Sequence, residues 1–499
     1  MLATHHAMSR APAFLLLTAA LAGCTVGPDY RPRTAAELGV PAGYSVPAPQ
    51  TPEDLTRWWS NFDDPVLGQL VEQARQANTD VAQAVARLRQ AREALVQSRA
   101  QLLPTLSGSA GYQRNENLRG GGRSFTLPDG TVVDTGGGGS NSFSAGLSAS
   151  YQLGLFGEVR RTVESSRAQY QASGFDYATA LLTVESEVAS NYILARAYQA
   201  QLANARASLA IQDDNLEIAG FRVQAGLVSS VDVEQARSQR AQTAATVPQI
   251  EQQYAAAVAR LGVLTGQAPG ALRGQLAAAR PIPRGPETVG VGIPADALRR
   301  RPDVRSAERT LAAATARIGV AKAALYPALA ISGNVNTNAT GLGSLGSAIT
   351  GSLFAGLTQA IFNGGRLRSV VRANEAATDA AYAAYKGTVL TALEDIENAI
   401  VALDTARRRE TQFRIAYEAA NNSAILARSQ YRTGLTDFTT LNTQESALLS
   451  AQNGLTQAQS DRATALVALY NALGGGWDPN VIPEAPARGA PLPSGTETR

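Results

Sequence analysis

The spacing of apolar residues changes several times along this chain of 499 residues. Between residues 143 and 153, apolar and small polar residues alternate, and a period of two is typical of a strand with one apolar face. Residues 106–113 alternate in the same way, so we expect the two segments to pair as a β-hairpin over residues 104–153. The apolar members of the longer run are Phe143, Ala145, Leu147, Ala149, Tyr151 and Leu153.

The period then changes to that of a long helix. No proline interrupts the chain from Val159 to about Gln224, and the apolar residues are three and four apart, as along a coiled-coil seam. Such a helix would be a rod of about 100 Å. It ends before a glycine turn, and a shorter returning helix is predicted from Asp232 to about Leu264.

The whole pattern occurs twice. Residues 80–106 return 223 positions later as residues 303–329, and residues 157–266 return 208 positions later as residues 365–474. Each copy predicts a helix, a β-hairpin, a long helix and a returning helix. We therefore expect an α+β, mainly α, internally duplicated fold. Its first repeat covers residues 63–265, and its second covers 301–474, with a hairpin at 327–362.

Three details of the first repeat complete this prediction. Asp64 and Pro65 are typical of a helix start, and a single helix is expected from there to about Ala100. The connection between the strands, residues 114–141, contains two glycine runs and predicts a flexible exposed loop. Pro248 interrupts the returning helix where the second copy has Thr456, so we expect a kink there.

The N-terminus has the features of a secreted lipoprotein precursor. Arg10 precedes an apolar run that is too short to span a bilayer, and Leu21-Ala22-Gly23-Cys24 follows. We expect residues 1–23 to be a signal peptide. We expect Cys24 to carry an acyl lipid such as palmitate, which would anchor the mature chain. The alternative is an ordinary signal peptide with a chance cysteine.

The three remaining segments are rich in proline or glycine. They are residues 24–62, the linker 266–300 and the tail 475–499, and we expect them to form a belt together.

Composition excludes several kinds of chemistry. Cys24 is the only cysteine, and both histidines, His5 and His6, lie in the signal peptide, so no histidine-based catalysis, disulfide or usual transition-metal site is expected. We therefore expect that the protein is not an enzyme and that it binds no cofactor other than the covalent lipid. The net charge of +3 gives no reason to expect a nucleic-acid partner. No later segment is apolar enough for a transmembrane helix.

Four strands per chain have a consequence for assembly. Strands that cross an outer membrane must belong to a closed barrel, and the smallest barrels have about eight strands. A homotrimer would supply twelve strands and close the helix pairs into a hollow α-helical barrel. Such an object would conduct, with Phe143, Leu147 and Tyr151 facing lipid and the serines facing a wet lumen.

Several motifs then resemble a known family, the TolC-type outer-membrane efflux proteins, in the lipoprotein branch that serves RND tripartite pumps. The resemblance covers essentially the whole mature chain. Its motifs are Cys24-Thr25-Val26-Gly27-Pro28-Asp29-Tyr30-Arg31-Pro32, Trp58-Trp59-Ser60-Asn61-Phe62, Leu298-Arg299-Arg300-Arg301-Pro302-Asp303-Val304 and Ile361-Phe362-Asn363-Gly364-Gly365-Arg366.

The resemblance implies a location, an assembly and a function. The protein would be anchored by lipid in the outer membrane of a Gram-negative bacterium and would project into the periplasm. It would be a homotrimer with a β-barrel, a periplasmic α-helical barrel and an equatorial belt. A periplasmic adaptor and an inner-membrane RND pump would be its partners, and it would be the passive exit duct for small molecules such as drugs, toxic compounds or metals.

The resemblance also implies two sets of site residues at the ends of the helices. The adaptor would dock at the turns Gly226-Leu227 and Gly434-Leu435, which as plain helix ends also require glycine. The aperture gate would include Asp232 and Tyr431. Three positions depart from the family: Thr436 stands in place of the gate arginine, and Thr440 and Thr443 stand in place of an acidic pair. Arg432 and Asp437 would be the local replacements in the gate.

Two other functions stay open on the sequence. The chain could be an exit duct for type I protein secretion, against which the lipoprotein signal argues. It could also be a lipid-anchored periplasmic coiled-coil scaffold, against which the alternating hairpins argue. The gate residues could equally be solvated residues of the helix ends.

Overall fold

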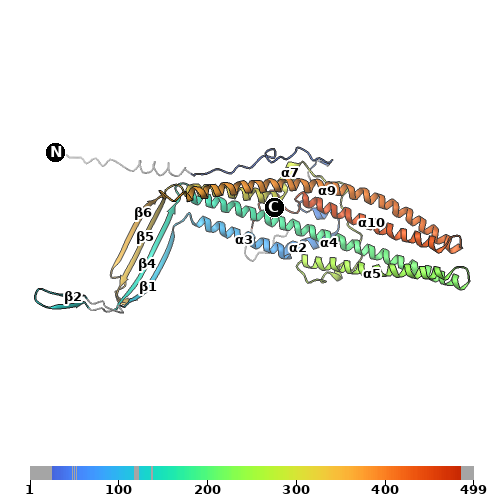
Figure 1. Cartoon of the computed structure of the whole chain (residues 1–499), viewed down its shortest axis with the longest axis horizontal. Helices are drawn as coiled ribbons and strands as arrows, with labels where there is room; N and C mark the ends of the chain where they lie inside the picture. The colour runs from blue at the N-terminus through green and yellow to red at the C-terminus, as the bar shows by residue number, and fades with distance from the viewer. Residues whose placement is uncertain are drawn as a thin grey trace. The chain divides into compact units, whose positions relative to one another are not determined.

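The computed structural model describes residues 25–47, 49, 51, 53–116, 123–135 and 139–484. The signal peptide and Cys24 lie outside the described residues. The fold is α+β and mainly α, as predicted, and the chain divides into two compact units (Figure 1). Of the described residues, those up to Arg31, in Glu93–Ala168 and in Leu311–Ala380 belong to the first unit, and those in Pro32–Arg92, in Gln169–Thr310 and from Ala381 onward belong to the second.

A four-stranded antiparallel sheet dominates the first unit. Its strands are β1 (Thr105–Asn115), β4 (Ser140–Leu153), β5 (Ala328–Ala339) and β6 (Ile349–Thr358), in the order β1-β4-β5-β6. Each copy of the repeat supplies one hairpin, and the pairing of β4 with β5 joins the two copies. Within the described residues, β1 and β6 are therefore the edge strands, each with one neighbour.

The strand register separates two faces of this sheet. Tyr112 lies opposite Phe143, and Leu147 lies opposite Val335, so the apolar residues of neighbouring strands share one face, here called the apolar face. Ser148 lies opposite both Ser107 and Asn334 on the other face, here called the polar face. Side chains on both faces are largely solvent-exposed in the single chain.

The described part of the connection between β1 and β4 contains strands where the sequence predicted a flexible loop. It contains a second, two-stranded antiparallel sheet of β2 (Arg123–Thr126) and β3 (Val132–Thr135). Gly130 turns the chain with φ +84°, and the Leu127 N–H donates to the Thr131 carbonyl at 2.9 Å. Aromatic and β-branched residues beside a Pro-Asp-Gly turn favour a hairpin, a signal that the glycine runs obscured.

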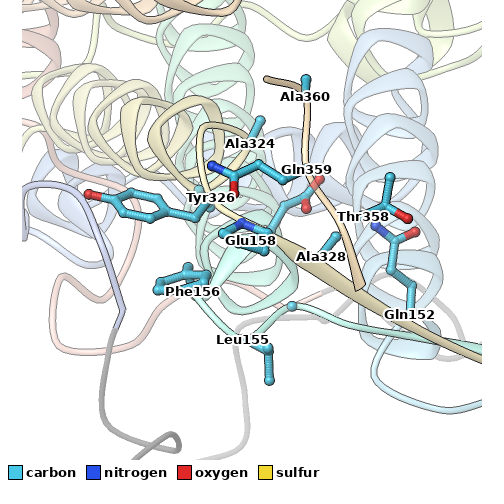
Figure 2. A pocket seen from close by; sticks show the side chains of 13 residues that line it. Gln152, Leu155, Phe156, Glu158, Ala324, Tyr326, Ala328, Thr358, Gln359 and Ala360 are labelled. Atoms are coloured by element: carbon cyan, nitrogen blue, oxygen red, sulfur yellow. The ribbon is translucent and has the colours of Figure 1, made fainter. Parts of the chain in front are cut away.

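A cavity of about 230 Å³ lies where the strands of the first unit meet its helices (Figure 2). Both copies of the repeat line it. Phe156, after β4, stacks on Tyr326, before β5, with ring centroids 4.6 Å apart. Gln152, Glu158 and Gln359 add polar groups to its wall.

The helix predicted from Asp64 to Ala100 is two helices, α2 (Pro65–Ala77) and α3 (Thr79–Ala100). Asn78 separates them in an extended conformation. Its side-chain oxygen accepts from the backbone N–H groups of Asp80 at 2.8 Å and Val81 at 3.1 Å, and its amide donates to the Leu264 carbonyl at 2.9 Å. Asn78 thus caps the start of α3 and is also held by a distant carbonyl, and the pattern of apolar residues alone reveals neither contact.

Two antiparallel helix pairs extend through the second unit. The first coil is α4 (Glu158–Gln224) with α5 (Ser230–Leu264), and the second coil is α9 (Arg366–Thr433) with α10 (Phe438–Ala472). The long helices have 67 and 68 residues, close to the predicted bounds. Helix α5 continues through Pro248, so the expected interruption does not end it.

The segments outside the repeats contact one another in the second unit. The Val291 N–H donates to the Pro49 carbonyl at 3.0 Å, and the Gly476 N–H donates to the Leu55 carbonyl at 2.8 Å. Trp58, in the 3-10 helix η1 (Trp58–Phe62), stacks on Tyr470 with centroids 5.4 Å apart. Two short helices, α6 (Arg273–Leu276) and α7 (Pro294–Arg300), lie in the linker before α8 (Pro302–Ala323).

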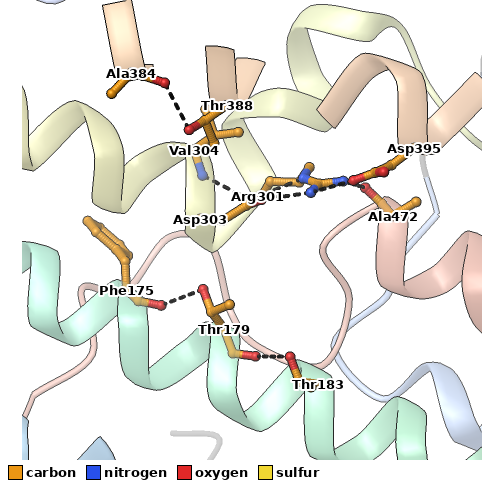
Figure 3. A network of polar contacts seen from close by, with 10 residues as sticks. All are labelled: Phe175, Thr179, Thr183, Arg301, Asp303, Val304, Ala384, Thr388, Asp395 and Ala472. Atoms are coloured by element: carbon orange, nitrogen blue, oxygen red, sulfur yellow. Dashed lines mark hydrogen bonds and ion pairs between the residues drawn. The ribbon is translucent and has the colours of Figure 1, made fainter. Parts of the chain in front are cut away.

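Arg301 connects the linker to the second coil (Figure 3). Its guanidinium donates to the Ala472 carbonyl at the end of α10 at 3.0 Å, to Asp303 at 2.7 Å and to Asp395 at 3.0 Å. The carbonyls of a last helical turn have no partner within the helix, so this contact satisfies one of them. Arg301 thus has a structural role at the end of α10.

Candidate functional site: the helical tips

The first coil turns at Gly226. Its φ of +70° is in the left-handed region, which glycine adopts without a steric penalty. The Gly226 N–H donates to the Val223 carbonyl at 2.9 Å and the Leu227 N–H donates to the Arg222 carbonyl at 2.9 Å. This pair of bonds is a Schellman motif, which ends a helix with its last carbonyls satisfied.

The second coil turns in the same way at Gly434, where φ is +79°. The Gly434 N–H donates to Tyr431 and the Leu435 N–H donates to Gln430, at 3.1 and 2.9 Å. Both turns place a leucine in solvent: Leu227 is 71% exposed and Leu435 is 79% exposed. The four predicted docking residues therefore form two similar tips, each with one uncovered apolar side chain.

The returning helices begin with different caps. The Ser229 hydroxyl accepts from the Val231 N–H at 3.2 Å at the start of α5. The Asp437 carboxylate accepts from the Thr440 N–H at 2.7 Å at the start of α10, and this bond lowers the pKa of Asp437. Asp437, which we expected in the gate, is the N-cap of its own helix.

Tyr431 lies inside the tip. It is 1% exposed and packs in a cluster that includes residues of both coils, with its ring edge-to-face with Phe438 at 6.0 Å. Burial raises the pKa of Tyr431, and the charge of Arg222 opposes this effect. Its hydroxyl has no hydrogen-bond partner among the described residues. The other buried members of the cluster are Ala236, Ala427 and Leu441.

Arg222 is the tip residue that the sequence did not single out. Its guanidinium carbon lies 4.5 Å from the centroid of the Tyr431 ring, which is a cation–π contact. A terminal nitrogen of the same side chain lies 3.4 Å from where a Cβ on Gly434 would be. Arg222 therefore links the end of α4 to the end of α9. The only signal for it was a basic residue in the last turn of a helix, where a cation is favourable.

The other predicted gate residues lie at the margin of this arrangement. Asp232, in the first turn of α5, is close enough to Tyr431 for its charge to help raise the pKa of that tyrosine. Arg432 is exposed, and in the described part of the chain it forms no ion pair. The structure thus brings Asp232 and Tyr431 together with Arg222, whereas Arg432 and Asp437 do not join them.

The described residues offer neither a membrane-spanning helix nor a metal site. None of the helices there combines the length and the hydrophobicity needed to cross a membrane. Within the same residues, no group of three or more histidine, cysteine or acidic side chains could hold a metal ion.

The chain is similar to proteins of known function along nearly its whole length. It is 32% identical to nodulation protein T of Rhizobium leguminosarum bv. trifolii over 94% of this chain and 97% of that protein. It is 35% identical to the pyoverdine export outer membrane protein OpmQ of Pseudomonas aeruginosa, over 85% of this chain and 88% of that protein. The solved structure of the outer-membrane channel OprN superposes with a TM-score of 0.79 at 34% identity, over 91% of this chain and 100% of that one.

The family comparison agrees with these similarities. The model of the family described as outer membrane efflux protein matches residues 70–267 and 293–475. Apart from the first residues of α2, the two matched segments contain the helices and strands of both repeats, including both tips. The resemblance to the TolC-type efflux proteins is confirmed, and this is a family of channels rather than of enzymes. The chain therefore belongs to the outer membrane efflux protein family.

Proposed function

We propose that this chain works as a homotrimer that forms the passive exit duct of a tripartite efflux system in the outer membrane of a Gram-negative bacterium. A periplasmic adaptor would dock on it, and an RND pump in the inner membrane would supply the energy. The cargo would be small molecules, and the name of the relative OpmQ states pyoverdine export for that protein.

The observation that carries this proposal is the sheet of the first unit. Its four strands have one apolar and one polar face, and both edges, β1 and β6, have backbone groups without a neighbouring strand in the described chain. A sheet in lipid must close, because open edges cannot be satisfied there. Pairing β6 of one copy with β1 of the next closes it, with the apolar face toward lipid and the polar face toward water.

The two tips support the docking part of the proposal. Leu227 and Leu435 are exposed at similar turns, and single apolar side chains in solvent suit insertion into an apolar site of a partner. We assign the adaptor contact to Gly226, Leu227, Gly434 and Leu435. The gate would be the surroundings of Tyr431, whose buried ring lies beneath the Arg222 guanidinium of the first coil.

The lipid anchor completes the proposal. Cys24 follows small residues in the sequence, and an acyl lipid on it would be the one covalent group of the mature protein.

Planar-bilayer recording of the detergent-extracted protein tests the duct. Trimers by mass and discrete conducting steps are expected, and deletion of the gene should increase sensitivity to toxic compounds. A monomer that never conducts contradicts the proposal and favours a scaffold. Mass spectrometry of a Cys24→Ser variant, which should lose the acyl chains, checks the anchor separately.

A further inference from the structure

The polar face of the four-stranded sheet has a uniform chemistry with one exception. In the described strands its positions carry only serine, threonine, asparagine, glutamine, glycine and alanine, apart from Phe354 in β6. No ionisable side chain belongs to this face in the same strands. The polar face is therefore an uncharged surface, rich in hydroxyl and amide groups, with Phe354 as its one aromatic side chain in these strands.

The register places Phe354 firmly on this face. It lies opposite Ser332, and the same row continues through Ser150 to Thr105, whose hydroxyls lie 2.8 Å apart. A Cβ on Gly356, two residues along the strand, would come within 2.5 Å of the Phe354 ring. The ring thus extends over the bare backbone of Gly356, which only glycine leaves open.

Exposure of the Phe354 ring to water is unfavourable if nothing contacts the ring. The side chain is 62% exposed, although burial of a phenylalanine is favourable by the hydrophobic effect. Leu353 and Ala355, its neighbours in the strand, point to the apolar face, where lipid would cover them. On the polar face water replaces lipid, so the ring remains free to contact whatever passes.

We infer that Phe354 is a contact site in the duct for the aromatic or apolar part of the cargo. The inference rests on the proposed function, because the polar face lines a lumen only in the closed barrel. Three copies of the ring then lie in one row of the homotrimer. Because the wall around each ring is uncharged, the contact accepts aromatic groups on anionic and cationic cargo alike.

The test uses the full-length protein in planar bilayers with four small ions as probes. Benzenesulfonate and phenyltrimethylammonium are aromatic ions of opposite charge, and methanesulfonate and tetramethylammonium are their counterparts without a ring. We expect both aromatic ions to stay in the open channel about two- to tenfold longer than their counterparts, seen as excess current noise. Phe354→Ser should abolish that difference, and Phe354→Tyr should keep it.

Ser352→Ala is the matched control. Ser352 lies two residues from Phe354 in the same strand and on the same face, and its substitution leaves the ring in place. It should keep the aromatic effect. An unchanged effect in Phe354→Ser overturns this inference while leaving conduction intact. Retention of phenyltrimethylammonium alone overturns the independence of charge, because a cation–π contact would then dominate. A wild-type protein that does not conduct contradicts the proposed function instead.

Discussion

The first and second coils have the same backbone plan but different buried chemistry. Both end in a glycine turn with the same pair of hydrogen bonds. The ion pair between Asp213 and Arg240 in the first coil is half-exposed, whereas in the second coil Arg428 pairs with Glu445, which is only 5% exposed. The turn is fixed by what the backbone requires, while the side chains that hold each coil together have diverged.

Two positions 208 residues apart sharpen this comparison. Tyr431, in the packed cluster, corresponds to Val223, which is only partly buried. Thr456, which is 7% exposed within α10, corresponds to Pro248 in α5. The second coil therefore has the more extensive buried contacts near its tip, and the first coil has a helix without one of its backbone donors. We expect the first coil to open locally more easily.

Truncation of Tyr431 should have the largest effect. Tyr431→Ala removes a buried ring and is expected to lower the free energy of local unfolding at the tip by about 3–5 kcal/mol. Hydrogen exchange of the amides of α9 and α10 measures this. Val223→Ala is the matched change in the first coil and should cost far less. Equal losses would remove the claimed difference between the coils.

Tyr431→Phe separates packing from gating. It keeps the ring and removes a hydroxyl that has no partner in the described chain, so hydrogen exchange should stay close to wild type. A rise in single-channel conductance would then show that the hydroxyl helps to hold the closed tip. Unchanged conductance would leave Tyr431 with a packing role alone.

Exchanging the residues at the proline position is expected to have the next largest effect. Thr456→Pro removes a backbone donor from the interior of α10 and should cost about 3 kcal/mol or more. It also removes the hydroxyl that donates to the Gln452 carbonyl at 3.0 Å. Pro248→Thr should slow hydrogen exchange in α5 by a smaller amount. Faster exchange in that variant would mean that the first coil needs its proline.

The ion pairs should rank next. Arg428→Ala leaves the buried Glu445 carboxylate without its partner, and we expect a loss of about 2–3 kcal/mol in the second coil. The half-exposed pair predicts a loss of about 0.2–1 kcal/mol for Asp213→Ala. Local hydrogen exchange near each pair compares the two directly. A larger loss for Asp213→Ala would reverse the comparison.

The caps predict the smallest effect, which depends on pH. The pKa of Asp437 in the folded chain lies below its ordinary value of 3.8, so the ionised cap stabilises the start of α10 above pH 3.8. This contribution is lost as the pH falls through the lower, folded pKa. Ser229 does not titrate, so amides at the start of α5 should keep their protection at pH 3. An Asp437→Ser variant should remove the difference in pH dependence between the two helix starts.

Features that depend on local pattern could be predicted from the sequence. The strand alternation around Leu147, the long helices and the glycine turns follow from periods of two and 3.6 residues and from the need for a positive φ at Gly226 and Gly434. The repeat offsets then predicted the same elements in the second copy. The four strands of the main sheet lie within the two predicted hairpins, residues 104–153 and 327–362.

Features that depend on distant contacts could not be predicted. The Leu264 carbonyl accepts from the amide of Asn78 between α2 and α3, and Arg222 gains its role because the ring of Tyr431 lies beneath it. We expected Asp437 in the gate because of its position near the tip. Its carboxylate instead accepts from a backbone N–H at the start of its own helix. These assignments need the tertiary structure, because many residue pairs fit the same spacing.

The pairing of β4 with β5 also determines the order in which the chain can fold. Phe143 lies opposite Ala339, so α4, α5, the linker and α8 separate the two strands in sequence. Contacts of such separation form slowly because the entropy of closing the loop comes first. The long helices form from near neighbours, so after export the first hairpin must remain soluble with an open edge until β5 arrives. The hairpin contains many serines and glycines, which have a low preference for strands. This composition would delay aggregation of the hairpin until β5 pairs with it.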